Sequence, residues 1–317
     1  MATAAKNASY LPPEIWIRTL KNFDQENDLP ELWMNYRHIC KPFQSAIDSI
    51  FIEKHLPKTW IRWSLGEMYS NEIGKVILDT EFKFHALSED KTTAIFQGDI
   101  GEDFRDEVRS RLKGRIQETT NAHAYTITEP SHTVQVHRDV NDSPLPDLTF
   151  DAENIHLSLN WRELYTRFYG EELLYHKGLQ NWSTDNTKLK EELAAKAGSG
   201  QTGMMEVLMK AMEAFAGGSD ESRRVARRAR IRRQFREIGD DWSFEASGDA
   251  GEEKRSLEGL AQTRQLVSLT EDSDYDRDEE EEEGSEEGSE EGDEWEDASD
   301  DDDMEEEDEE EEEEDDA

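Results

Sequence analysis

The sequence predicts an α+β protein, and three patterns along the chain indicate this class. Over residues 10–56, apolar and aromatic side chains recur at the spacing of amphipathic helices. From Thr59 the period changes to two, most clearly over residues 76–85, where apolar and polar residues alternate as in a half-buried strand. Residues 104–116 carry an apolar side chain at every fourth position and predict a helix between strands. We therefore expect an antiparallel sheet with helices on one face, then isolated helices and a disordered acidic tail.

Each predicted element depends on a local signal. The N-terminal region predicts three helices: the first begins at Pro12, where proline is tolerated, the second is capped by Asn27 or Asp28, and the third follows Pro42. A longer amphipathic helix begins at Trp161. The remaining strands are expected at residues 59–65, 92–97, 123–128, 133–138 and 155–160.

The negative charge of the chain is concentrated at its C-terminal end. Of a formal net charge of −41 at pH 7, residues 271–317 carry −33, from 34 acidic residues and one basic residue. The other 270 residues carry only −8, which is ordinary for a soluble protein. The tail has almost no apolar area to offset about 1–2 kcal/mol of backbone entropy per ordered residue, so we expect it to be disordered.

These patterns divide the chain into five expected segments. The segments are a disordered N-terminus at residues 1–9, a helical module at 10–56, an α+β domain at 57–182, a Met-rich and then Arg-rich helical region at 183–239, and a disordered acidic tail at 240–317. The α+β domain is expected to recognise a target protein or to pack against the module.

The composition also limits the location and the cofactors of the protein. Cys40 is the single cysteine, so an intrachain disulfide and a cysteine zinc cluster are both impossible. The first ten residues lack the apolar stretch of a secretory signal, and no run approaches 18 apolar residues. We expect a protein of the nucleus or the cytoplasm that binds no membrane and no cofactor.

The strongest motif lies within residues 11–51. Its residues are the run Leu11-Pro12-Pro13-Glu14-Ile15-Trp16, then Leu20, Phe23, Leu32, the run Arg37-His38-Ile39-Cys40-Lys41, and Phe43. This pattern resembles the F-box, and more closely the F-box found at the start of many fungal proteins. The resemblance covers about 45 of the 317 residues. It implies three helices that dock on the Skp-type linker subunit of a cullin–RING ubiquitin ligase. The contact residues that it implies are Leu11, Pro12, Ile15, Trp16, Leu20, Leu32, Ile39 and Phe43.

A physical argument supports an interface at this module. A segment this short cannot bury all its large apolar side chains within itself, so the surplus must face the next domain or another protein. Tryptophan and phenylalanine are side chains that dominate such contacts. The alternative is a three-helix cap that packs on the α+β domain and binds no outside partner.

Eight arginines are concentrated in residues 222–236. The seven that define the basic signal are Arg223, Arg224, Arg227, Arg228, Arg230, Arg232 and Arg233. On a helix they point in nearly all directions, which is typical of a solvent-exposed helix or of one that meets a charged partner. The segment is interpreted as a nuclear localisation signal or as a binding site for the protein's own acidic tail. Nucleic-acid binding ranks third because the acidic tail would compete for the arginines. A solvated helix without a binding function is an alternative of equal weight to each of these interpretations.

Motifs for catalysis are missing from the sequence. It contains no phosphate loop, dinucleotide-binding glycine motif, HExxH or GxSxG, and we expect neither an enzyme nor a metal site. Glu171 and Glu172 are adjacent on a predicted helix and point about 100° apart, so we expect a solvated edge rather than a catalytic pair. The methionine-rich segment at residues 204–215 is expected to pack on a neighbouring element, with a promiscuous binding groove as the alternative.

Two functions of different classes remain. The first is a substrate-recognition adaptor of a Skp–cullin–F-box ubiquitin ligase, which would bind the linker subunit through the N-terminal module and an unknown protein target elsewhere. The second is an acidic-tailed binding protein or chaperone for basic proteins such as histones. An enzyme hidden in the α+β domain ranks third.

Overall fold

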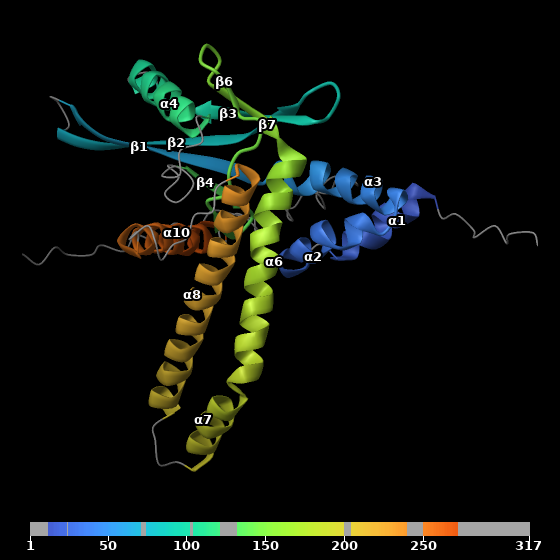
Figure 1. Ribbon diagram of the computed structural model, residues 1–317, viewed down its shortest axis with the longest axis vertical. Coiled ribbons are helices and arrows are strands. Elements are labelled where there is room, and N and C mark those ends of the chain that lie inside the picture. Colours follow the sequence, from blue (N-terminus) through green and yellow to red (C-terminus); the bar gives the residue numbers. More distant parts are fainter. Residues whose placement is uncertain are drawn as a thin grey trace, which may run out of the picture. The chain divides into compact units, whose positions relative to one another are not determined.

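The computed structural model describes residues 12–23, 25–70, 74–101, 104–120, 132–199, 204–239 and 250–271. The chain divides into two compact units, Met1–Asp272 and Ser273–Ala317, and all the described residues belong to the first. The first unit combines helices with an antiparallel sheet, as the α+β prediction states (Figure 1). The predicted contact residue Leu11, the N-terminal segment 1–9, the predicted strand at 123–128 and residues 272–317 of the acidic tail lie outside the described residues.

Three helices lie in the N-terminal region, as expected. They are α1 (Pro13–Leu20), α2 (Leu29–Met34) and α3 (Lys41–Ile50), and each has a proline within its first two positions, where no intrahelical N–H bond is lost. Short 3₁₀ turns separate them at Lys21–Phe23, Glu26–Asp28 and Tyr36–His38. The third helix continues into a π-helical turn, Phe51–His55.

The described strands form one antiparallel sheet of seven strands in the order β5-β4-β1-β2-β3-β7-β6. Their bounds are β1 Thr59–Ser70, β2 Gly74–Leu87, β3 Thr93–Asp99, β4 His132–Val136, β5 Asp139–Asn141, β6 Thr149–Asp151 and β7 His156–Asn160. The alternation predicted for β2 is confirmed, because Leu78 and Phe82 are buried while Asp79 and Lys83 are exposed. Ile61 of β1 pairs with Phe82, so the buried faces of the two strands coincide.

The remaining helices are α4 (Arg105–Thr120), α6 (Trp161–Asp185), α7 (Thr187–Ser199), α8 (Met204–Glu237) and α10 (Ala250–Glu271). The side chain of Asn160 caps α6 by accepting a hydrogen bond from the backbone N–H of Glu163 at 3.2 Å. No described helix has both the length and the apolar character needed to cross a membrane.

A single core joins parts that the sequence placed in separate segments. One cluster of buried apolar side chains includes Leu32 and Phe51 of the N-terminal helices, Phe82 of the sheet, Leu112 of α4 and Tyr165 of α6. The boundary expected near residue 56 therefore runs through a shared core and does not separate two packed bodies.

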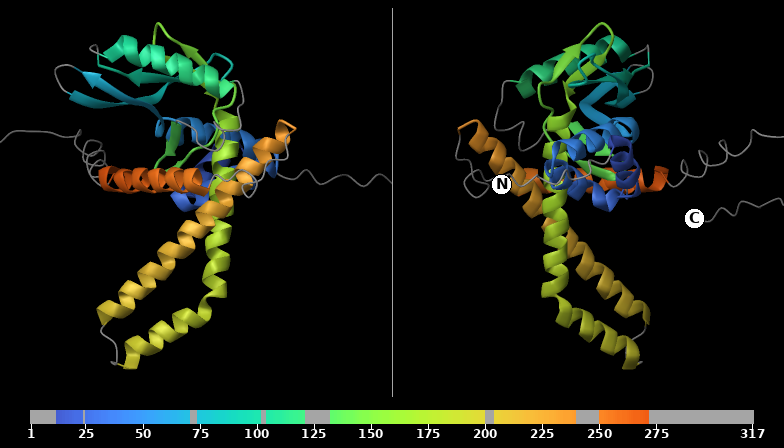
Figure 2. Two further views of the ribbon diagram at one scale, coloured as in Figure 1. Left: turned by 60° about the vertical axis from the view of Figure 1, so that its left-hand side comes forward. Right: turned by 90° about the vertical axis from the view of Figure 1, so that its right-hand side faces the viewer.

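The expectation of isolated helices after the sheet is wrong. The two long helices α6 and α8 pack against each other and then diverge, and α7 links their far ends (Figures 1 and 2). Gly218 of α8 faces the ring of Trp182, and Gly178 of α6 faces Ser222, so small residues allow the two backbones to approach closely. The expected disorder from residue 240 also does not hold for Ala250–Glu271, which forms helix α10. That helix packs Leu260 and Val267 against Val140 of β5.

Candidate functional site

The inner face of the N-terminal module is fixed to the rest of the protein. Trp33 is buried, and its indole N–H donates a hydrogen bond to the hydroxyl oxygen of Thr166 on α6 at 3.1 Å. The Trp33 ring also lies 5.8 Å from that of Trp161 and 5.4 Å from that of Tyr165. Asp48 of α3 accepts a hydrogen bond from Arg162 of α6 at 2.9 Å. These contacts hold the module in one orientation on α6.

The outer surface of the module keeps large apolar side chains exposed. Ile15 on α1 is 45% exposed and Ile39 before α3 is 62% exposed, and Pro12 is exposed as well. Between the two helices, the half-buried rings of Trp16 and Phe43 pack with centroids 4.6 Å apart. We call these five residues the outer surface of the module. An aromatic pair flanked by exposed apolar side chains on rigid helices is typical of a protein-docking surface.

Two predicted contact residues do not belong to this surface. Leu20 is 4% exposed and Leu32 is fully buried, and both are part of the core. The reason is the close packing of the module on α6, which covers the side of the module that carries Leu32. Of the eight predicted residues, five are therefore accessible or partly accessible, two are sealed, and Leu11 lies outside the described residues.

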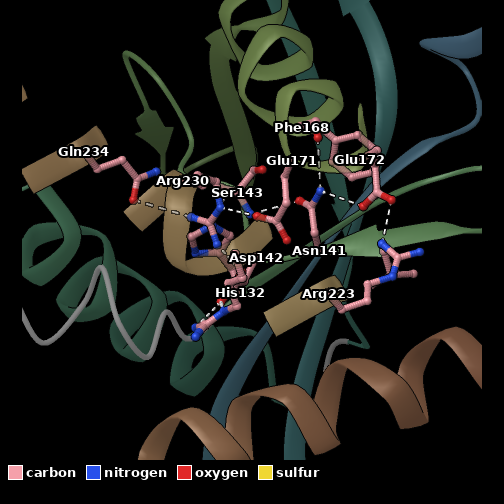
Figure 3. A network of polar contacts seen from close by, with 12 residues as sticks. His132, Asn141, Asp142, Ser143, Phe168, Glu171, Glu172, Arg223, Arg230 and Gln234 are labelled. Carbon is pink, nitrogen blue, oxygen red and sulfur yellow. Dashed lines mark hydrogen bonds and ion pairs between the residues drawn. The ribbon is translucent and has the colours of Figure 1, made fainter. Parts of the chain in front are cut away.

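The arginine segment forms the second half of α8, and three of its side chains reach into the protein. Arg227 donates to the carboxylate of Asp142 through Nε at 2.9 Å and Nη2 at 2.5 Å. Arg230 donates to Asp142 and to Glu171 of α6, and all four side chains of this group are nearly inaccessible to solvent (Figure 3). Asp142 directly follows β5, so the cluster connects α6, α8 and the end of the sheet.

A neighbouring group extends this network along α6. Arg223 donates to Glu172 at 2.5 Å, lies 4.0 Å from Asp139, and stacks its guanidinium over the ring of Tyr175 at 3.6 Å. The other oxygen of Glu172 accepts a hydrogen bond from the side-chain amide of Asn141 at 3.3 Å (Figure 3). The expectation that Glu171 and Glu172 form a solvated edge is therefore wrong. The two carboxylates are buried because arginines of α8 compensate their charge.

The electrostatics of the network follow from its burial. Burial by itself would raise the pKa of Asp142, but Arg227 and Arg230 outweigh it and hold that pKa below the usual range. Burial raises the pKa of Glu171 in spite of Arg230. Burial, reinforced by the charge of Glu172, raises the pKa of Asp139 to about 8. Arg223 lies 4.0 Å from Asp139 but 2.5 Å from Glu172, so it compensates the charge of Asp139 less well.

Most of the predicted basic signal is engaged inside the protein. Besides the three arginines above, Arg228 forms a double hydrogen bond with Glu253 of α10, at 2.6 and 2.5 Å. Arg224 is more accessible and pairs with Glu221, while Arg232 and Arg233 are exposed. Of the two alternatives for this helix, exposure to solvent or contact with a charged partner, the second holds for the four arginines engaged inside the protein, and the partners belong to the same chain. Arg223, Arg227 and Arg230 are spaced four and three residues apart, and this helical spacing was the signal that they share one face.

Two cavities adjoin the arginine segment of α8. The space beside Arg230 and Glu171 is about 30 Å³, which accommodates little more than a water molecule. A larger cavity of about 540 Å³ lies between α8 and α10, but the cations that line it already contact carboxylates or a backbone carbonyl. Within the described ranges, no three histidine, cysteine or acidic side chains are grouped to hold a metal ion.

Comparisons with known proteins add no relative to this description. Neither the profiles of known protein families, nor curated proteins, nor solved structures match the chain. The fold and the sites define an α+β protein whose N-terminal helices present an apolar surface and whose long helices are joined by a buried ion network.

Proposed function

We propose that the protein is the substrate-recognition adaptor of a Skp–cullin–F-box ubiquitin ligase, and that the outer surface of the module binds the linker subunit. The observation that carries this proposal is the division of the module into two faces. One face, with Trp33 at its centre, packs on α6. The other keeps Ile15 and Ile39 about half exposed or more beside the Trp16–Phe43 pair. A cap with no outside partner has no reason to retain this second apolar face.

The adaptor would act through proximity. Rigid attachment of the module to α6 means that a target bound elsewhere on the unit would be held at a defined position relative to the linker subunit. The high local concentration of the target near the transferring enzyme would accelerate ubiquitin transfer. The chemistry itself would belong to other subunits of the ligase.

The test is binding of the purified full-length chain to the linker subunit, measured by calorimetry. The variant Ile15→Glu with Ile39→Glu places two charges on the outer surface, and we expect binding to weaken by roughly 100-fold or more. Both side chains are exposed in the free protein, so the fold should be little affected. The matched control is Ile77→Glu, because Ile77 is 65% exposed on β2, away from the module.

Two results would count against the adaptor. The first is a native chain that does not bind the linker subunit. The second is a double variant that binds as well as Ile77→Glu, which would place any contact elsewhere.

A second function, binding of basic proteins through the acidic tail, is supported by the pairing of the arginines. Arg223, Arg227, Arg228 and Arg230 have carboxylate partners on α6, α10 or next to β5, so the charge of −33 in residues 271–317 is not needed to neutralise them. Deletion of residues 272–317 removes no residue of α10 and should abolish a salt-sensitive capture of histones. Equal capture by the shortened chain would contradict this function.

A further inference from the structure

The first half of α8 carries apolar residues on two of its sides. Val207 and Gly218 are buried, and Ala211 and Ala214 are partly buried, on the side towards α6 and α7. A second row follows the three-four spacing of a coiled-coil seam. Its residues are Met205, Leu208, Met212 and Phe215, flanked by Met204 and Met209. We call these six residues the methionine stripe.

The methionine stripe is not covered by the described part of the chain. Its six side chains are between 51% and 72% exposed. The segment packs on α6 and α7 through Val207 and its neighbours, but the prediction that its methionines pack on a neighbouring element is wrong. In Figure 2 the first half of α8 diverges from α6, and α7 connects the far ends of the two helices. The acidic tail is a poor candidate to cover the stripe, since it has almost no apolar side chains.

We propose that the methionine stripe pairs with the same stripe of a second copy of this chain, so that two helical hairpins form a bundle across a two-fold axis. The proposal is independent of the adaptor function. Six large apolar side chains, each more than half exposed, offer on the order of 600 Å² per copy, which approaches the ~800 Å² per partner of a standard interface. Two hairpins packed face to face make a common helical architecture.

The charges around the stripe are compatible with a partner of identical sequence. A two-fold contact places the same surface on both sides, so a charged patch would repel its own copy. Glu206, Lys210 and Glu213 lie on the opposite side of α8, at helical positions more than 100° from the centre of the stripe, and Lys210 pairs with Glu206 at 2.7 Å. These three charges of α8 therefore lie away from the seam between two copies.

One end of the stripe also has room for a side chain of the second copy. A cavity of about 430 Å³ adjoins Phe215 and is lined by Leu179 and Trp182 of α6. The rings of Trp182 and Phe215 lie 6.1 Å apart at its edge. Methionine side chains adapt their shape readily, which suits filling such an irregular space.

The test is the mass of the full-length chain in solution, measured by light scattering over a range of micromolar concentrations. We expect a mass that rises with concentration from 36.6 kDa towards twice that value. The variant Met209→Glu with Met212→Glu should weaken the association by roughly 100-fold or more. The matched control is Gly217→Glu, which adds a charge on the same helix at a position where a side chain meets no atom within 4 Å. It should associate like the native chain.

Salt provides a second readout. Each chain carries −41, so association should strengthen when ionic strength rises, because screening reduces the repulsion between copies. A contact made by the acidic tail with a basic region would weaken instead. If the glutamate variant misfolds by circular dichroism, Met209→Gln with Met212→Gln removes apolar area with less disturbance and should still weaken the association. A native chain whose mass stays at 36.6 kDa would overturn the proposal, even if its methionine stripe bound a different protein. Equal association of the native chain and the stripe variants would overturn it as well.

Discussion

Replacing Arg230 with methionine tests whether the buried ion network holds α8 to the rest of the unit. Arg230 contacts Asp142 and Glu171, and the side chains of the three residues are only 6%, 4% and 2% exposed. In Arg230→Met, Asp142 keeps its contact with Arg227, but Glu171 loses the arginine that compensates its charge. Removal of one partner from a buried pair costs about 3–5 kcal/mol. That loss is a large share of the ~5–15 kcal/mol by which native domains are stable.

The assay is urea unfolding of the full-length chain followed by tryptophan fluorescence, which yields the free energy of unfolding. The matched control is Arg224→Met, because Arg224 lies on the same helix and pairs with Glu221 at the surface, with side chains 42% and 55% exposed. An exposed pair of this kind contributes less than about 1 kcal/mol, so the control should unfold close to the native midpoint.

A double variant separates the cost of an uncompensated charge from the value of the pair. Arg230→Met combined with Glu171→Met replaces both charges with apolar side chains of similar size, and should regain at least half of the stability that Arg230→Met loses. If Arg230→Met unfolded within about 1 kcal/mol of Arg224→Met, the buried ion network would not be what holds α8 to the rest of the unit. If the double variant were no more stable than Arg230→Met alone, the uncompensated charge of Glu171 would not be the cause of the loss.

Two further predictions concern packing and pH. Gly218→Ala should lower the unfolding free energy by about 1–3 kcal/mol because its Cβ would clash with the ring of Trp182. Gly217→Ala, which has open space around it, should stabilise α8 by up to about 1 kcal/mol. Equal urea midpoints for the two variants would contradict this prediction. Asp139, with its pKa raised from 3.8 to about 8, keeps a proton that the unfolded chain releases, so its contribution to stability falls between about pH 4 and pH 8. Asp139→Asn should therefore gain stability relative to the native chain as the pH rises from 5 to 8, and an unchanged difference between their midpoints would refute the assignment.

Local patterns were sufficient to predict most of the elements. The alternation in β2, the prolines at the helix starts and the spacing in α4 and α6 depend on a residue and its near neighbours, and the predicted elements are present at these places. The outer surface of the module was also foreseeable in part, because a short segment with many large apolar side chains must leave some of them exposed. Which of them are exposed was not foreseeable, since Leu20 and Leu32 belong to a core that the module shares with the sheet and α6.

Composition and short-range periodicity are enough to predict the class of the fold, the positions of most of its regular elements and the concentration of charge in the tail. The packing of distant elements decides two other features. Glu171 and Glu172 are buried opposite arginines of α8 that lie 59 and 51 residues away in the chain, and the methionine stripe is open to solvent. A charged or an apolar side chain can lie on the buried side or on the solvent-exposed side of a helix. Its environment is set by which other element packs there, and that pairing is a property of the whole chain.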